Sequence, residues 1–427
     1  MTTSTGLHPW LLANGIYNHT LSASADTAKY NTIIGTLSGG LGGFKSWENS
    51  QLGGSLMASG SYFDRGPAAT GAQAGGSFWR QSYVADLGYS QQVSRRLKFI
   101  VQQLGGLSDG GYGLGSGFGA NGVPGMTSSY GAGSTTAGGA SGLDAFGNPA
   151  NNGLVDNEIF SSRTKFYSGS VSMDYQISQR LYASGWGQAS IIRRSGSLYG
   201  MDNAGGGGNV QYRATQMSVL GVGVQLGTTR YPGQFGGIRN ESIFGVFTQR
   251  VTRTMSYTMQ AGVGRVRSEF IGAVTLPPEV AAILGAGSSL QVTDTQFLSP
   301  VYNLSIHKIF ELGTLILAGG RSFSAGNGFV QAGIRDTASI NFGRALTPKL
   351  SANLVATYFR MSGRVGLLQV TETAQVGGMA SYRFYRHLSL TAQAGTRYVG
   401  VTHGARRLDA YAGVGIGWSP GDHAFSF

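Results

Sequence analysis

The sequence predicts an all-β protein that forms one closed, antiparallel, up-and-down barrel. Many short segments alternate apolar and polar residues with a period of two, the pattern of strands with one apolar and one polar face. The 427 residues include 71 glycines but only 12% charged residues, too few to cover a soluble surface of this size. No run of about 18 apolar residues occurs, so a closed barrel is the way left for this chain to cross a membrane.

A single domain over residues 1–427 is expected, because the same pattern continues from about residue 30 without a change of composition. Residues 1–12 are assigned as an N-terminal tail, and 13–22 as the first strand. The first five residues lack the basic and apolar regions of a signal peptide, so we expect a mature chain from which that segment has been removed.

Further strands follow along the chain, joined alternately by short and long connections. We expect them at residues 51–63, 83–89, 97–101, 167–177, 181–191, 219–226, 244–249, 255–263 and 330–342. The short polar turns are at residues 93–96, 177–180, 251–254 and 346–349. In such barrels short turns gather on one rim and long connections on the other, so we place the short turns on the periplasmic side.

Three long connections are expected at residues 107–156, 195–208 and 269–299. The first is rich in Gly, Ser and Ala and nearly free of charge, so it cannot form a core of its own. We expect an extracellular loop there, and the sequence leaves open whether it folds into the lumen. Residues 277–284 of the third are expected to form one or two helical turns.

The alternation is clearest near the C-terminus, where four strands are expected between Leu350 and Trp418, followed by a tail at 419–427. Small and medium apolar side chains occupy one face and aromatic residues the strand ends, as in a membrane barrel with interfacial girdles. The residues expected to face lipid are Leu350, Leu354, Val370, Val376, Leu388, Leu390, Leu408, Val414 and Ile416. The girdle aromatics are Tyr358, Tyr382, Phe384, Tyr398 and Trp418. Glycines fall mostly on the polar face, where the interior needs room.

The number of strands is expected to be even, since both chain ends belong on the rim with the short turns. Counting from residue 13 gives about 16 to 18 strands for a barrel of this class. Residues 209–230 account for the range, because they hold either one strand or two.

With its alternating segments, short turns of the Ser-Arg-Arg type, Gly-rich long loops and C-terminal Phe427, the chain resembles bacterial outer-membrane β-barrels of the porin-like class. The resemblance covers nearly the whole chain as a pattern. It implies the outer membrane of a Gram-negative bacterium, contact with membrane lipid and lipopolysaccharide, and recognition of Phe427 by the barrel-assembly machinery. The chain departs from the class where Pro420 and Gly421 interrupt the last run. Trimers are common in the class, but no interface can be read here, so a homo-oligomer stays open.

Charged residues on the polar face carry the functional expectation. Burying them in lipid would cost several kcal/mol each, so they belong in a hydrated lumen. They are Lys98, Asp174, Arg335, Arg383, Arg397, Arg407 and Asp409. We expect a channel for passive passage of small solutes, with a weak preference for anions if these charges act on solutes and are not merely structural. The alternatives are a plugged structural or adhesive barrel without transport, and a soluble secreted Gly-rich β protein.

Other functions find little support in the sequence. Residues 117–122 match the dinucleotide spacing GxGxxG, but without a preceding strand or a following helix. The six histidines are isolated, and there is no cysteine, so we expect no metal site, no cofactor and no enzyme. The net charge of +12 is scattered, which disfavours nucleic acid as a partner.

Overall fold

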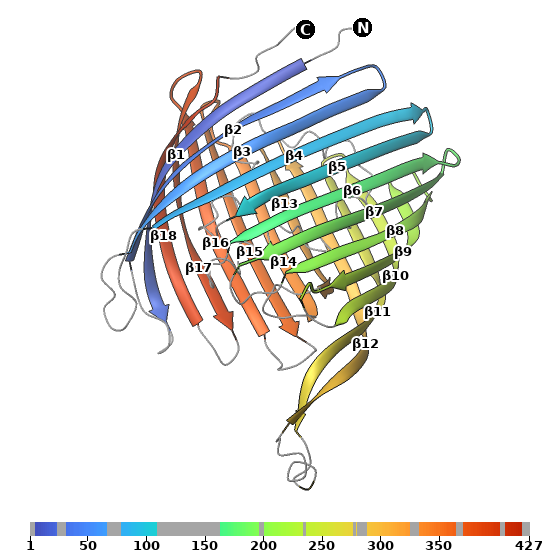
Figure 1. The fold of residues 1–427 in the computed structure, drawn as a ribbon. Helices are drawn as coiled ribbons and strands as arrows, with labels where there is room; N and C mark the ends of the chain where they lie inside the picture. Colours follow the sequence, from blue (N-terminus) through green and yellow to red (C-terminus); the bar gives the residue numbers. More distant parts are fainter. Residues whose placement is uncertain are drawn as a thin grey trace.

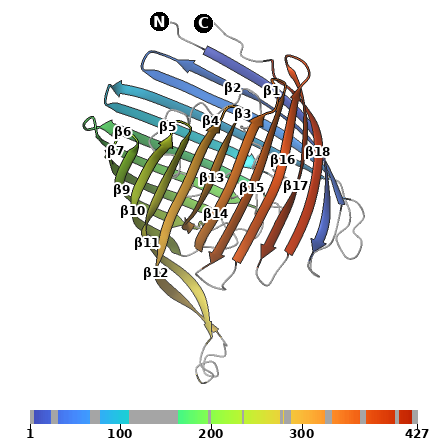
Figure 2. The same cartoon turned by 180° about the vertical axis from the view of Figure 1, so that it is seen from behind.

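The protein is an 18-stranded antiparallel β-barrel, seen in a computed structural model that describes residues 5–23, 31–65, 78–108, 163–195, 200–233, 236–275, 279, 288–324, 333–363, 370–401 and 406–420. Figures 1 and 2 show the strands as one wall that curves round and closes on itself. The strands are β1 (Thr5–Ala23), β2 (Asn31–Ser46), β3 (Ser50–Arg65), β4 (Phe78–Ser94), β5 (Leu97–Ser108), β6 (Thr164–Gln176), β7 (Leu181–Arg194), β8 (Met201–Arg213), β9 (Ser218–Arg230), β10 (Gly236–Thr252), β11 (Met255–Thr275), β12 (Ser288–Phe310), β13 (Gly313–Ser324), β14 (Gly333–Ala345), β15 (Leu350–Gly363), β16 (Val370–Arg383), β17 (Leu388–Val401) and β18 (Arg406–Trp418).

The wall closes because each strand pairs with its neighbours in the sequence and the first strand pairs with the last. β1 lies antiparallel to β2, with Ile16 opposite Ile34, and to β18, with Leu11 opposite Trp418. A closed sheet leaves no edge strand, so its backbone groups can be satisfied inside a membrane. The expected all-β, up-and-down barrel is therefore confirmed, with the number of strands at the upper end of the expected range.

The two rims differ as the sequence predicts. The connections after β2, β4, β6, β8, β10, β12, β14 and β16 are short, and they lie on the same rim as the start of β1 and the end of β18. We call this the short-turn rim and the opposite one the long-connection rim. Within the described residues, no helix is long and apolar enough to span a membrane.

Several expected boundaries are wrong. β1 begins at Thr5, so most of the expected tail at 1–12 is strand, held by pairing with β2. The long connection expected at 195–208 is largely β8, whose glycine run pairs on both sides with β7 and β9. Residues 209–230 thus contain the end of one strand and a second one. The connection expected at 269–299 is mostly the ends of β11 and β12.

β11 and β12 form a long hairpin that projects past the rest of the wall (Figures 1 and 2). Their pairing runs from Met255 opposite Lys308 to Thr275 opposite Ser288, whereas the pairing of β12 with β13 ends at Tyr302. Pro300 lies just beyond this point and has no backbone N–H to donate to a neighbouring strand, which is consistent with the separation.

Other expectations fall largely outside the described residues. Leu107 and Ser108 belong to β5, but the rest of the expected loop at 107–156, including the GxGxxG match, is not described. The helical turns expected at 277–284 are likewise outside, apart from Glu279. β18 ends at Trp418, so the expected tail begins where predicted, although only Ser419 and Pro420 of it are described.

Candidate functional site

The two faces of the wall have opposite chemistry. Large apolar side chains on alternate residues are exposed on the outside, such as Leu298 at 68%, Val222 at 65% and Val414 at 64%. On the other face polar side chains are enclosed, such as Asn18 at 0% and Asp409 at 1%. An apolar exterior around a polar interior is stable in hydrocarbon and unstable in water, so the barrel is a membrane-spanning one of the outer-membrane type.

The apolar residues singled out in the sequence lie together on the outer side of β15–β18. Leu354, Val376, Leu390, Val414 and Ile416 are exposed, while Leu350, Val370, Leu388 and Leu408 are half-buried. On neighbouring strands these residues lie side by side. Leu390, for example, lies opposite both Tyr382 and Ile416. That they contact lipid stays a prediction.

The predicted girdle aromatics lie at two heights of the wall. Tyr382 lies opposite Leu350, and Trp418 lies opposite Leu388, both beside the short-turn rim, and Phe384 is exposed in the turn after β16. Tyr358 and Tyr398 flank Ala374 nearer the long-connection rim. Two separated aromatic levels are the arrangement expected at the two surfaces of a membrane.

A charged cluster lies on the inner face of β17 and β18. Arg397 is opposite Asp409, and Arg407 Nε donates to Asp409 Oδ2 at 2.7 Å. Thr20 Oγ1 of β1 donates to Asp409 Oδ1 at 3.0 Å. Asp409 is thus a fully enclosed carboxylate that accepts hydrogen bonds from Arg407 and Thr20, with Arg397 as its cross-strand neighbour.

The remaining predicted lumen charges are spread over the same face. Arg335 of β14 lies over the Phe359 ring, with its guanidinium carbon 5.2 Å from the ring centroid. Lys98 and Asp174 are cross-strand neighbours on β5 and β6. Arg383 lines a cavity of about 580 Å³ beside the short-turn rim, together with Asn341, Asn353, Met379 and Ser381. The structure brings Arg397, Arg407 and Asp409 together, pairs Lys98 with Asp174 across two strands, and places Arg335 and Arg383 apart from both groups.

Several inner charges were not singled out in the sequence. Arg80 packs its guanidinium over Phe63, 5.1 Å from the ring centroid, and Asp86 accepts a hydrogen bond from Ser55. Arg194, Arg213 and Arg250 also occupy inner-face positions of their strands. The alternation of residues 83–89 already placed Asp86 on the polar face, so that signal was available. Arg80, Arg194 and Arg213 lie beyond the segments where alternation was traced.

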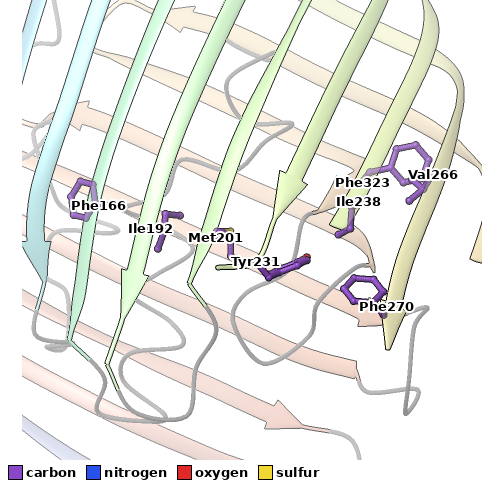
Figure 3. Packing of buried hydrophobic residues seen from close by; sticks show 8 residues of the cluster. All are labelled: Phe166, Ile192, Met201, Tyr231, Ile238, Val266, Phe270 and Phe323. Carbon is purple, nitrogen blue, oxygen red and sulfur yellow. The ribbon is translucent and has the colours of Figure 1, made fainter. Parts of the chain in front are cut away.

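An apolar cluster faces the lumen on the opposite part of the wall (Figure 3). It lies at the ends of the strands beside the long-connection rim. Most of its members occupy inner-face positions, but Tyr231 follows the end of β9, and Phe323 lies on β13 beyond the last pairing of that strand with β12. Its members are Phe166, Ile192, Met201, Tyr231, Ile238, Val266, Phe270 and Phe323. Tyr231 stacks at a tilt on Phe270, with centroids 5.7 Å apart. Alternation alone could not predict this cluster, because it interrupts the polar face.

The wall gives little support for a group that titrates near neutral pH or for a metal site. Burial raises the pKa of the Tyr231 hydroxyl, and the nearby Arg194 guanidinium lowers it by less, so this tyrosine is neutral at physiological pH. In the part of the chain that the structure describes, no three His, Asp or Glu side chains come close enough to hold a metal ion. His8 stacks on Phe44 and His19 bonds to Asn31, consistent with structural roles.

No protein-family model matches the sequence, and no curated protein matches it significantly. Among solved structures the chain is similar to the outer membrane protein OpdK of Pseudomonas aeruginosa, with 10% identity, 97% of this chain and 98% of that chain covered, and a TM-score of 0.41. It is also similar to OccK9 (OpdG) of the same organism, with 9% identity, 97% and 98% coverage and a TM-score of 0.41. For OccAB1 of Acinetobacter baumannii the values are 9%, 97%, 96% and 0.38. At these values the likeness is one of general architecture, and the fold assignment rests on the closed register of this chain.

Proposed function

We propose that the protein is an outer-membrane channel for the passive diffusion of small solutes, with a weak preference for anions. The observation that supports the proposal is the charge on the inner face of the described strands. The basic residues there are Arg80, Lys98, Arg194, Arg213, Arg250, Arg335, Arg383, Arg397 and Arg407, and the acidic ones are Asp86, Asp174 and Asp409. Fixed positive charge along a lumen attracts anions and repels cations.

The two alternatives differ in how they fit the described wall. A soluble Gly-rich β protein is disfavoured by the apolar exterior, since side chains such as Leu298 and Val222 would then be exposed to water. A plugged structural barrel depends on residues 107–156, most of which the structure does not describe. Electrical recording separates that alternative from an open channel.

The experiment is single-channel recording of the purified protein in a planar bilayer, followed by the reversal potential in a potassium chloride gradient. We expect discrete conductance steps and a reversal potential whose sign shows that chloride is more permeable than potassium. The absence of steps would exclude an open channel. A cation-selective reversal potential would contradict the anion preference alone.

Arg335 offers a test with a matched control at the same height of the wall. Arg335 lies opposite Met361 on the inner face, and Arg360 lies opposite Asp336 on the outer face. Arg335→Gln should therefore move the reversal potential toward zero, whereas Arg360→Gln should leave it unchanged. Equal shifts in both variants would show that inner-face charge does not set the selectivity.

A further inference from the structure

Basic residues gather at the short-turn rim around most of the barrel. Seven of the eight short turns carry at least one Lys or Arg, in the turn or at an outward position of the strand end beside it. We call this set the basic rim: Lys45, Arg95, Arg96, Arg180, Arg253, Lys308, Arg344, Lys349 and Arg386. In the same stretches the carboxylates are Glu48 and Glu311. The charge at this end is therefore strongly positive.

Among the described residues, no ion pair balances the charge of the basic rim. At the long-connection end, arginines are paired with carboxylates on the outer face, as in Arg321 with Asp336 at 2.6 Å and Arg360 with Glu372 at 3.3 Å. The rim side chains contact neutral groups instead, as where Lys308 Nζ lies 3.3 Å from Thr254 Oγ1.

Each short turn also exposes an apolar or aromatic side chain. These are Trp47, Val93, Ile177, Met217, Val251, Leu312, Leu346 and Tyr385. A little further into the wall lie outward aromatic residues, among them Tyr175, Tyr212, Phe310 and Tyr382. Aromatic, apolar and basic side chains thus lie together at this end of the wall. Such a mixture is typical of the zone where a protein meets the hydrocarbon edge and the headgroups of a membrane.

From these observations we propose that the basic rim binds the phosphate groups of anionic phospholipid in the leaflet that surrounds the short turns. An exposed apolar side chain and a basic one occur together at seven of the eight short turns, around most of the circumference. Annular lipid surrounds a barrel in the same way, whereas a soluble acidic partner would cover one sector or the open end. Basic groups near a membrane surface attract anionic lipid by about 1 kcal/mol each. The inference needs a membrane-embedded barrel but not a conducting lumen.

The test measures lipid selectivity on the folded protein in phosphatidylcholine membranes. Spin-labelled phosphatidylglycerol and spin-labelled phosphatidylcholine each report a motionally restricted fraction, and the ratio gives the relative association constant. We expect phosphatidylglycerol to be favoured by about threefold at low ionic strength, and the preference to fall as salt screens the charges. No preference for phosphatidylglycerol in the wild type would overturn the proposal without any variant being made.

Matched variants locate the effect. Replacing Arg95, Arg96, Arg180 and Arg386 by Gln should at least halve the preference. Replacing Lys165, Arg230, Arg239 and Arg265 by Gln removes the same charge from the outer face near the other rim and should leave the preference nearly unchanged. Loss in the second set and not in the first would contradict the proposal.

If polyglutamate in solution bound to the wild type and displaced no lipid, the rim would be a site for a soluble acidic partner, and the lipid proposal would be wrong. Heat-dependent gel mobility checks that each variant is folded, and conductance is not needed for either result.

Discussion

Neighbouring residues of one strand face opposite sides of the wall, and substitution by arginine tests which side each one faces. Val414 of β18 is exposed on the outer face, where an arginine near the membrane midplane costs about 2–4 kcal/mol. Gln393 of β17 lies on the inner face, opposite Gly413. Val414→Arg should therefore assemble poorly, and Gln393→Arg should assemble normally, as measured by the fraction with heat-dependent gel mobility. Normal assembly of the first with failure of the second would mean that the faces are reversed.

Gly413 itself is a poor inner-face control. A Cβ there would lie 2.8 Å from the Gly15 carbonyl oxygen, so any side chain would strain the wall before its charge mattered. The sequence predicted that inner-face glycines provide room in the lumen. At several positions, however, the room is filled by a side chain that lies flat against the wall, and the sequence could not show which glycines have this role.

Gly207 is the clearest example of such packing. A Cβ there would lie 3.1 Å from the Trp186 ring and 2.4 Å from the Val224 carbonyl oxygen, so Gly207→Ala should cost about 1–3 kcal/mol through overpacking. At Gly35, a Cβ would meet nothing within 4 Å, so Gly35→Ala is the matched control. The denaturant midpoint of unfolding from vesicles should fall for Gly207→Ala only. Equal midpoints for the two variants would show that the Trp186 contact does not constrain the wall.

Three of the short turns have the same pattern of hydrogen bonds. Ser178 Oγ accepts hydrogen bonds from the backbone N–H groups of Arg180 at 3.3 Å and Leu181 at 3.1 Å. Ser94 and Thr347 do the same in their own turns. A Ser or Thr hydroxyl thus satisfies the turn backbone, which accounts for its repeated place after an apolar residue in these turns.

Removing one of these hydroxyls should weaken the hairpin by a modest amount. Ser178→Ala should lower the free energy of unfolding by about 0.5–1.5 kcal/mol, because a turn hydrogen bond is lost at an exposed site. Ser178→Thr keeps the hydroxyl and should restore the wild-type value. Refolding titrations in denaturant measure both. A Ser178→Thr variant as weak as Ser178→Ala would indicate that the side-chain volume matters and the hydroxyl does not.

The sequence predicted the elements best where the outer face is apolar along the whole strand, as in β15–β18. β8 was assigned to a connection because its run of glycines resembles a loop, although both neighbouring strands hold it in the sheet. No segment was predicted for β2, β12 or β13. The first part of β12 was assigned to a connection because Asp294 and Gln296 stand among its outer-face residues, on the hairpin that projects past the wall. Alternation of apolar residues reports contact with hydrocarbon, so it is lost where a strand leaves the membrane.

The whole molecule is a wall with an apolar outer face and a polar inner face. The sequence predicted most of this difference between the faces. It also predicted that the seven charged residues share the polar face. It could not predict the hydrogen bond from Thr20 of β1 to Asp409, nor the apolar cluster at the other side, because both depend on contacts between strands far apart in the chain.

The most direct test of this asymmetry is a cysteine scan along β17. The chain has no cysteine of its own, so single cysteines at positions 389 to 394 report without background. Reaction with a membrane-impermeant maleimide in vesicles should be fast at Ser389, Thr391 and Gln393 and slow at Leu390, Ala392 and Ala394. The reverse alternation, or no alternation, would contradict the assignment of the faces. Slow reaction at all six positions would show that the lumen is not filled with water and would contradict an open channel.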